Sequence, residues 1–232
     1  MTAPRPPASA GPGTPPFSFT VRPTTPTAGA VTAYLVRAVG APRTAPPLAH
    51  AVAHAEPPGH PTVSRIDLAE GADGTPLCTV RPLGEHTWQV SAADGTSLAL
   101  LEHRPGRLLP WPRRPRWTVR CDGDGTTLVG PVGTLHGWAC CLAGWPLLLW
   151  AALQTGEDVD LRLRATRVTW RGTGPGAPAP LSRRGRRHRY TVEPSRLDAR
   201  VAYAQAVLAE WYVLPARARR RLVRRAARRR GR

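Results

Sequence analysis

The sequence predicts a mainly β domain of the α+β class, built around one buried helix. Residues 197–214 form a run in which Gln205 and Glu210 are the main interruptions of an apolar stretch. A helix that is apolar on nearly every side must be buried all round. Before it, a short element occurs three times, in which an Asp-Gly pair separates apolar segments. We therefore expect hairpins in the body of the chain, with the helix in the middle of what they form.

The first 28 residues are rich in Pro, Ala, Thr and Gly and offer little to bury. This composition predicts a disordered arm over residues 1–28. Residues 29–61 form a second region, in which 30–39 reads as a first strand or a short helix. Residues 42–61 contain repeated prolines and read as a linker. His50, His54 and His60 lie in this linker, but Ala51 occupies the place of the Glu that a zinc protease motif needs.

From Thr62 onward, short apolar segments alternate with turn signals, so we predict one folded domain over residues 62–214. The repeated turns are Asp73-Gly74, Asp94-Gly95 and Asp124-Gly125. Asp-Gly between alternating segments is a strong hairpin signal, because Gly accepts the positive φ that such turns need. Further strands are predicted at residues 160–165, 166–171 and 189–193. Residues 172–185 read as a long mobile loop.

Residues 137–153 form a second apolar run with Pro146 near its middle. Their length is at the bottom of the range for a membrane span. Buried strands or a core helix fit the pattern, and so does contact with a membrane, because short apolar runs cannot be typed by periodicity.

The helix at 197–214 is shorter than the roughly 20 residues that a bilayer requires. Ser195 and Asp198 have the spacing of a capping box, with Ser195 as the N-cap. Pro215 is expected to end the helix, since proline disfavours helical geometry at the residue before it.

The net charge of +18 is concentrated in three clusters, and all 33 basic residues are Arg. Residues 217–232 contain ten Arg and no acid, and 104–116 and 183–189 contain five each. Outside these clusters the chain is close to neutral. Clustered basic charge predicts a polyanionic partner, either anionic lipid or nucleic acid. The tail at 215–232 also has the pattern of a basic amphipathic helix.

The candidate binding residues combine guanidinium groups with Trp side chains that could stack on bases or lie at a headgroup boundary. They are Arg104, Arg107, Trp111, Arg113, Arg114, Arg116, Arg217, Arg219, Arg220, Arg221, Arg224, Arg225, Arg228, Arg229 and Arg230, with Trp117 beside them.

The sequence contains no G-x-S-x-G motif, phosphate-binding Gly loop or Ser/His/Asp grouping, so we predict no catalytic residues, no cofactor and no metal site. The four cysteines form no C-x-x-C pair and read as free thiols of a reducing compartment. The N-terminus lacks the apolar segment of a secretory signal. The predicted location is cytoplasmic, with peripheral contact at the inner membrane surface.

Several motifs, taken in order, resemble the tubby C-terminal-like superfamily, especially its phospholipid scramblase and LURP-one-related branch. The similarity covers roughly residues 62–214. It is carried by Trp88-Gln89-Val90 with Asp94-Gly95, Leu101 through the Arg-rich loop to Trp117-Thr118-Val119 with Asp124-Gly125, Val168-Thr169-Trp170-Arg171-Gly172, Tyr190-Thr191-Val192, Leu197-Asp198 and the apolar helix.

The resemblance implies a closed antiparallel β-barrel around a C-terminal hydrophobic helix, and binding of phosphoinositide or other anionic lipid. The chain departs from the scramblase pattern, because it has no N-terminal Cys cluster and no acidic calcium segment, and an Arg tail follows the helix. Calcium-driven lipid scrambling is therefore not expected. The leading hypothesis is a non-enzymatic protein that binds anionic phospholipid headgroups. The alternatives are a nucleic-acid-binding protein that uses the Arg tail, and a scaffold without a polyanionic ligand.

Overall fold

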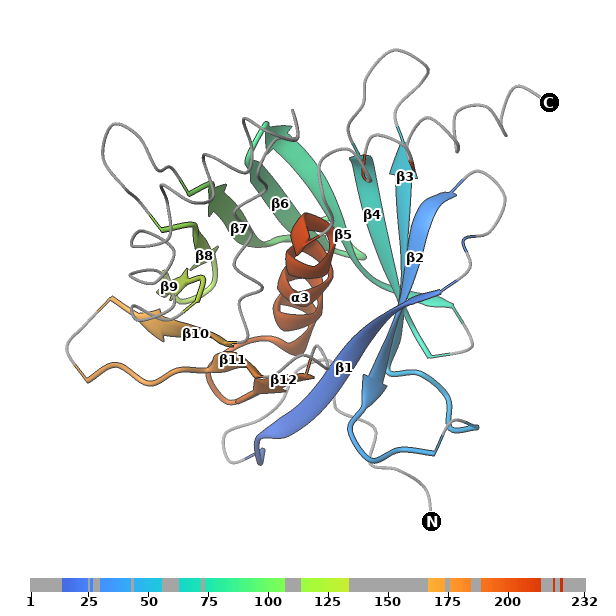
Figure 1. The fold of residues 1–232 in the computed structure, drawn as a ribbon, viewed down its shortest axis with the longest axis horizontal. Coiled ribbons are helices and arrows are strands. Elements are labelled where there is room, and N and C mark those ends of the chain that lie inside the picture. The colour runs from blue at the N-terminus through green and yellow to red at the C-terminus, as the bar shows by residue number, and fades with distance from the viewer. Residues whose placement is uncertain are drawn as a thin grey trace, which may run out of the picture.

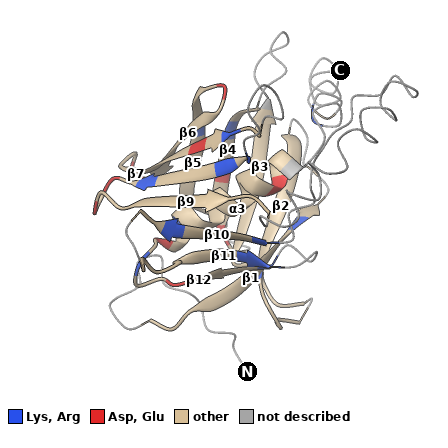
Figure 2. Ribbon diagram, turned by 60° about the vertical axis from the view of Figure 1, so that its left-hand side comes forward, with Lys and Arg blue, Asp and Glu red and all other residues tan. Residues whose placement is uncertain are grey.

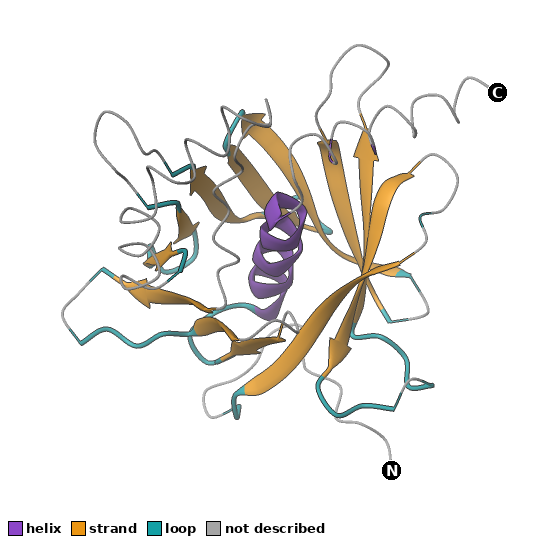
Figure 3. Cartoon of the chain, in the orientation of Figure 1, coloured by secondary structure: helices purple, strands orange, loops and turns teal. Residues whose placement is uncertain are grey.

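The computed structural model describes residues 14–24, 26, 30–42, 44–55, 63–71, 74–106, 114–133, 167–173, 176–184, 189–213, 219 and 222. In this part of the chain, twelve strands form one closed antiparallel barrel, in which each strand pairs with the next and β1 pairs with β12. One helix, α3, lies inside the ring of strands (Figure 1). The predicted barrel around a buried C-terminal helix is confirmed (Figure 3).

The elements follow one another without crossovers, as a meander that ends in the helix. They are β1 Phe17–Thr24, β2 Ala30–Ala38, β3 Ala49–Ala55, β4 Val63–Glu70, β5 Thr75–Gly84, β6 Thr87–Ala92, β7 Ser97–Arg104, β8 Arg116–Cys121, β9 Thr127–Pro131, β10 Arg167–Gly172, β11 Leu181–Arg184, β12 Arg189–Val192 and α3 Ala199–Val213.

The barrel begins earlier in the chain than the sequence predicted. Residues 1–28 were expected to be a disordered arm, but β1 lies within them and closes the barrel against β12. Phe19 and Val21 of β1 are fully buried. Phe19 stacks on Tyr190 of β12 at 5.4 Å between ring centroids and meets Tyr203 of α3 edge-on at 5.0 Å. The boundary at residue 62 is therefore wrong, and the barrel starts at Phe17.

The predicted linker at 42–61 contains β3, which pairs with β2 and β4. Ala49, Ala51 and Ala53 are buried, while His50 and His54 are half-buried on the other face. The His54 Nε2 lies 3.2 Å from Asp67 of β4, so this imidazole belongs to a strand pair rather than to a solvated linker. The segment 30–39, expected to be a strand or a helix, forms strand β2.

The predicted loop at 172–185 contains a further strand, β11, which pairs with β10 and β12. The strands predicted at 166–171 and 189–193 are confirmed as β10 and β12. The strand predicted at 160–165 and the apolar run at 137–153 lie outside the described residues.

The Asp-Gly turns are confirmed at the ends of three hairpins. Gly74, Gly95 and Gly125 all have positive φ, between 66° and 87°. At two of these turns the Asp carboxylate accepts a hydrogen bond from the backbone N–H two residues later, at 2.9 Å. These are Asx turns, in which the side chain fixes the local backbone.

One glycine is required for packing rather than for its φ. A Cβ at Gly130 of β9 would lie 2.8 Å from the indole of Trp170 on β10. Trp170 is fully buried, so the strand can approach the ring only because Gly130 has no side chain.

The helix begins one turn later than expected. The Arg200 N–H donates to the Asp198 carboxylate at 2.8 Å, and the Ala202 N–H donates to the Asp198 carbonyl at 3.0 Å. These contacts make Asp198 the N-cap, so the assignment of Ser195 is wrong. The described part of the helix runs to Val213, and Pro215, which was predicted to end it, lies outside the described residues. Its side chains from Val201 to Trp211 are buried against the barrel wall.

The two polar interruptions of the helix are both buried, and Glu210 joins a network with the wall. Arg183 of β11 places a guanidinium nitrogen 3.2 Å from the Glu210 carboxylate, and each side chain is 7% exposed. The Tyr190 hydroxyl donates to the same carboxylate at 2.7 Å. Burial raises the pKa of Tyr190 well above its usual value, and the negative charge of Glu210 adds to this effect. The network fixes α3 against β11 and β12.

Candidate functional site

The meander gives the barrel two ends that differ in charge. Because the strands alternate in direction, the last residues of β5, β7, β9 and β11 and the first residues of β6, β8, β10 and β12 all lie at one end, together with the C-terminal end of α3. We call this the basic end. The N-cap of α3 and the Asp94 and Asp124 turns lie at the other end, which we call the Asp-Gly end.

Arginines gather at the basic end, at strand termini and in the connections next to them. Figure 2 shows the charged residues along the ribbon. The Glu102 carboxylate pairs with Arg104, and Glu85 lies in the β5–β6 turn at the same end. The described arginines at this end include Arg81, Arg104, Arg114, Arg116, Arg167, Arg184, Arg189 and Arg219.

The structure brings part of the predicted binding set together. Arg104 and Arg116 face each other across β7 and β8. The Arg104 Nε is 2.7 Å from the Glu102 carboxylate, and the Arg114 guanidinium donates to the Gly133 carbonyl. The remaining members lie outside the described residues: Arg107, Trp111, Arg113, Arg217, Arg220, Arg221, Arg224, Arg225, Arg228, Arg229 and Arg230.

Trp117 is a core residue, which corrects the prediction that it lies on the binding surface. It is 3% exposed and belongs to an aromatic layer that fills the barrel near the basic end. The layer consists of Trp88, His103, Trp117 and Tyr212, with ring centroids 4.5–5.9 Å apart. Edge-to-face and tilted packing at these distances adds to the stability gained from burying the rings.

The start of the Arg tail contacts this aromatic layer. The Arg219 guanidinium lies over the Tyr212 ring, 4.4 Å from its centroid, which is a cation–π geometry. Leu222 packs with Val31 and Trp211 at the rim of the barrel. Burial raises the pKa of Tyr212, and Arg219 partly opposes that effect. Sequence reasoning treated the tail as separate from the fold, but these two residues are attached to it.

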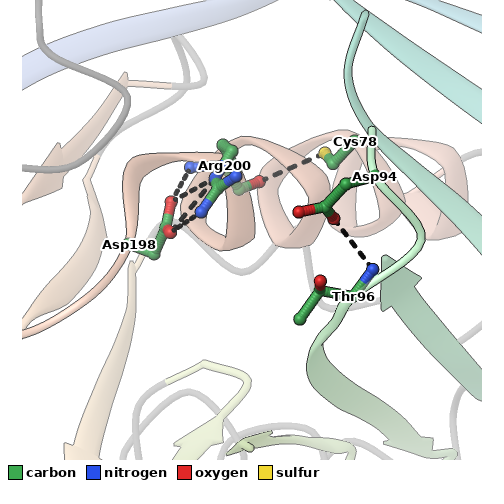
Figure 4. Close-up of polar contacts among 5 residues, drawn as sticks. All are labelled: Cys78, Asp94, Thr96, Asp198 and Arg200. Carbon is green, nitrogen blue, oxygen red and sulfur yellow. Dashed lines mark hydrogen bonds and ion pairs between the residues drawn. The ribbon is translucent and has the colours of Figure 1, made fainter. Parts of the chain in front are cut away.

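At the Asp-Gly end, a shallow hollow of about 310 Å³ lies beside the start of α3. Its wall includes Glu70, Thr75, Asp94 and Arg200. The Arg200 guanidinium donates to both carboxylate oxygens of Asp198, to Oδ2 at 2.7 and 3.1 Å and to Oδ1 at 3.2 Å (Figure 4). The Asp198 contact raises the pKa of Arg200. The carboxylate and the guanidinium therefore satisfy each other here, at the first turn of the helix.

The cysteine next to this hollow is not poised for nucleophilic chemistry. The Cys78 thiol is buried and donates to the Arg200 carbonyl at 3.8 Å. Burial raises the pKa of Cys78 to about 12, so the thiolate form is scarce at neutral pH. Burial likewise raises the pKa of Cys121 to about 11.

Two further features bear on the site. None of the described His, Cys, Asp and Glu side chains form a group of three or more suited to holding a metal ion. The helix that the structure describes is too short to cross a bilayer.

Comparison with family models, with curated proteins and with solved structures found no match in any of the three.

Proposed function

We propose that this protein is a non-enzymatic barrel that docks on anionic membrane surfaces through its basic end. The observation that carries the proposal is the gathering of Arg side chains at one end of the fold. The Arg-rich connection between β7 and β8 and the start of the Arg tail belong to the same end. Charge collected on one face gives a planar anionic surface many simultaneous contacts.

The magnitude of the electrostatic term is adequate for docking. Near an anionic leaflet, each Arg is worth up to about 1 kcal/mol. The tail alone carries ten Arg and no acid. The attraction falls off within a Debye length of about 8 Å at physiological salt, so only charges close to the surface contribute. A basic end that meets the bilayer directly satisfies this condition.

The test is binding of the full chain to three surfaces across a salt series: vesicles containing phosphatidylserine, vesicles of phosphatidylcholine alone, and duplex DNA. We expect binding to the phosphatidylserine vesicles, weakened by salt, and no binding to phosphatidylcholine alone. Tight duplex binding, with log affinity falling linearly against log salt and no affinity for anionic vesicles, would overturn the proposal and support the nucleic-acid alternative.

A further inference from the structure

The tip of the β5–β6 hairpin carries an exposed apolar side chain at the basic end. Leu83 is 61% exposed. Among the described residues, one other large hydrophobic side chain is classed as exposed, Val39 at 37%, and it follows β2 at the Asp-Gly end. Single exposed hydrophobic residues are common on protein surfaces, so exposure alone does not identify a site. The position and the backbone around Leu83 provide the argument.

The tip of the β5–β6 hairpin is not paired with β4. The pairing of β5 with β4 stops at Ile66 opposite Val80. The pairing of β5 with β6 continues to Gly84 opposite Thr87. The last four residues of β5 are therefore held by β6 and reach beyond the paired part of β4. Leu83 therefore lies in a part of the hairpin that has no pairing with β4.

A β-bulge lies at the same position. Pro82 pairs with Trp88 and Gly84 with Thr87, so Leu83 is the extra residue between the two pairs. A bulge redirects a side chain and marks a local feature of the fold. Arg81, two residues before Leu83, is exposed as well, so the hairpin presents a cationic and an apolar side chain near its tip.

The turn behind the tip is held firmly. The His103 N–H donates to the His86 carbonyl at 2.8 Å, and the two imidazole rings meet edge-on at 6.1 Å. The Tyr212 hydroxyl donates to the Glu85 carbonyl at 3.5 Å. The hairpin is thus braced by β7 and by the C-terminal end of α3. Because the turn is already rigid, its insertion into a binding partner costs little conformational entropy.

We propose that Leu83 is an apolar anchor that enters the acyl boundary of an anionic bilayer, while Arg81 and the basic end contact the headgroups. This inference rests on the proposed membrane function. It attributes to Leu83 the part of the membrane affinity that salt does not screen. The partner is an anionic bilayer, because it combines negative headgroups, which attract the basic end, with an apolar layer beneath them that can hold Leu83. Glu85, whose side chain is 88% exposed at the same turn, opposes docking.

The experiment measures partitioning of the full chain onto vesicles of 30% phosphatidylserine in phosphatidylcholine, from low to high salt. Leu83→Ser removes the anchor, Val39→Ser is the matched control at the far end, and Glu85→Gln removes the opposing charge. Leu83→Ser is expected to weaken partitioning about tenfold at every salt concentration, with the slope against log salt unchanged. Val39→Ser is expected to match the parent chain, and Glu85→Gln to bind more tightly at low salt.

The outcomes separate the anchor from the function on which it rests. If the parent chain binds these vesicles and Leu83→Ser binds equally well, or Val39→Ser loses as much, the anchor is wrong and the electrostatic docking stands. If the parent chain does not bind at any salt concentration, the proposed function is wrong and the anchor falls with it. Thermal melting of each variant checks folding, which these exposed positions should leave intact.

Discussion

The two ends of the barrel use their charges in different ways. At the Asp-Gly end, the carboxylates of Asp94 and Asp124 bind the backbone of their own turns, and Asp198 caps the helix and pairs with Arg200. Each of these charges serves the local fold. At the basic end, the guanidinium groups of the described residues outnumber the nearby carboxylates. A charge that is neutralised within the fold attracts a binding partner only weakly, whereas an excess of one charge attracts an oppositely charged partner over a distance.

The helix connects the two ends, so breaking it should have the largest effect. Leu208 is 1% exposed near the middle of α3. Leu208→Asp places an unpaired carboxylate in the core, which costs several kcal/mol against a total domain stability of about 5–15 kcal/mol. We expect the domain to unfold, as followed by circular dichroism during heating. Leu83→Asp, at an exposed position, is the control and should melt like the parent chain. Parent-like melting of Leu208→Asp would refute the central position of the helix.

The buried ion pair offers a finer test of the same attachment. Arg183→Met removes the Arg183 guanidinium from the buried Glu210 carboxylate, which should cost about 3–5 kcal/mol in unfolding free energy. The double variant Arg183→Met with Glu210→Gln removes both charges and should recover part of this loss. Chemical denaturation of the two variants gives the comparison. A double variant less stable than Arg183→Met would contradict the role given to the pair.

The Asp-Gly turns should be sensitive to β-branched substitution. Gly95 and Gly125 have φ of +87° and +66°, which Val adopts only with strain. Gly95→Val and Gly125→Val should each lower the unfolding free energy by about 1–2 kcal/mol. Gly123 lies beside Gly125 but lacks a positive φ, and open space surrounds its Cβ position, so Gly123→Val is the control. Equal losses at all three positions would show that backbone conformation is not the cause.

Shortening the tail should affect stability least and binding strongly. A chain that ends after Leu222 loses six Arg but keeps Arg219 on Tyr212 and Leu222 on the barrel rim. We expect its melting temperature to match the parent chain, while its affinity for anionic vesicles falls and depends less on salt. A chain that ends before Arg217 also loses the ring contact, so it should be less stable by about 0.5–1 kcal/mol. Unchanged vesicle affinity after both cuts would exclude the tail from docking.

The elements that sequence analysis found carry strong local signals. The Asp-Gly turns, β10, β12 and the apolar helix are of this kind. β3 was missed because its buried residues are Ala49, Ala51 and Ala53, too small to produce a visible apolar alternation. β1 was missed because prolines and threonines surround a short Phe-Ser-Phe-Thr-Val alternation. Its partner β12 is far away in sequence, and local patterns contain no information on such pairing.

Sequence analysis predicted the candidate site only as a set of charged residues, without their arrangement in space. Sequence analysis found the Arg clusters but could not place them at one end, since that depends on the direction of every strand. It assigned Trp117 to the surface, because a Trp flanked by arginines in sequence has the same local pattern whether its indole faces a membrane or the protein core. The Leu83 tip gives no sequence signal either. Its exposure follows from the bulge and from the register of β4, which only the fold defines.

The closure of β1 on β12 also sets the order in which the molecule can be assembled. Ser18 and Thr191 share a hydrogen bond across a separation of 173 residues, and the helix that fills the interior follows every strand in the chain. During synthesis, the early hairpins form with no centre to pack on, so their inward apolar faces stay uncovered until the last element appears. Long-range pairing of this kind slows folding. The barrel fold is thus completed late and in one step, in which β1 pairs with β12 and α3 fills the core.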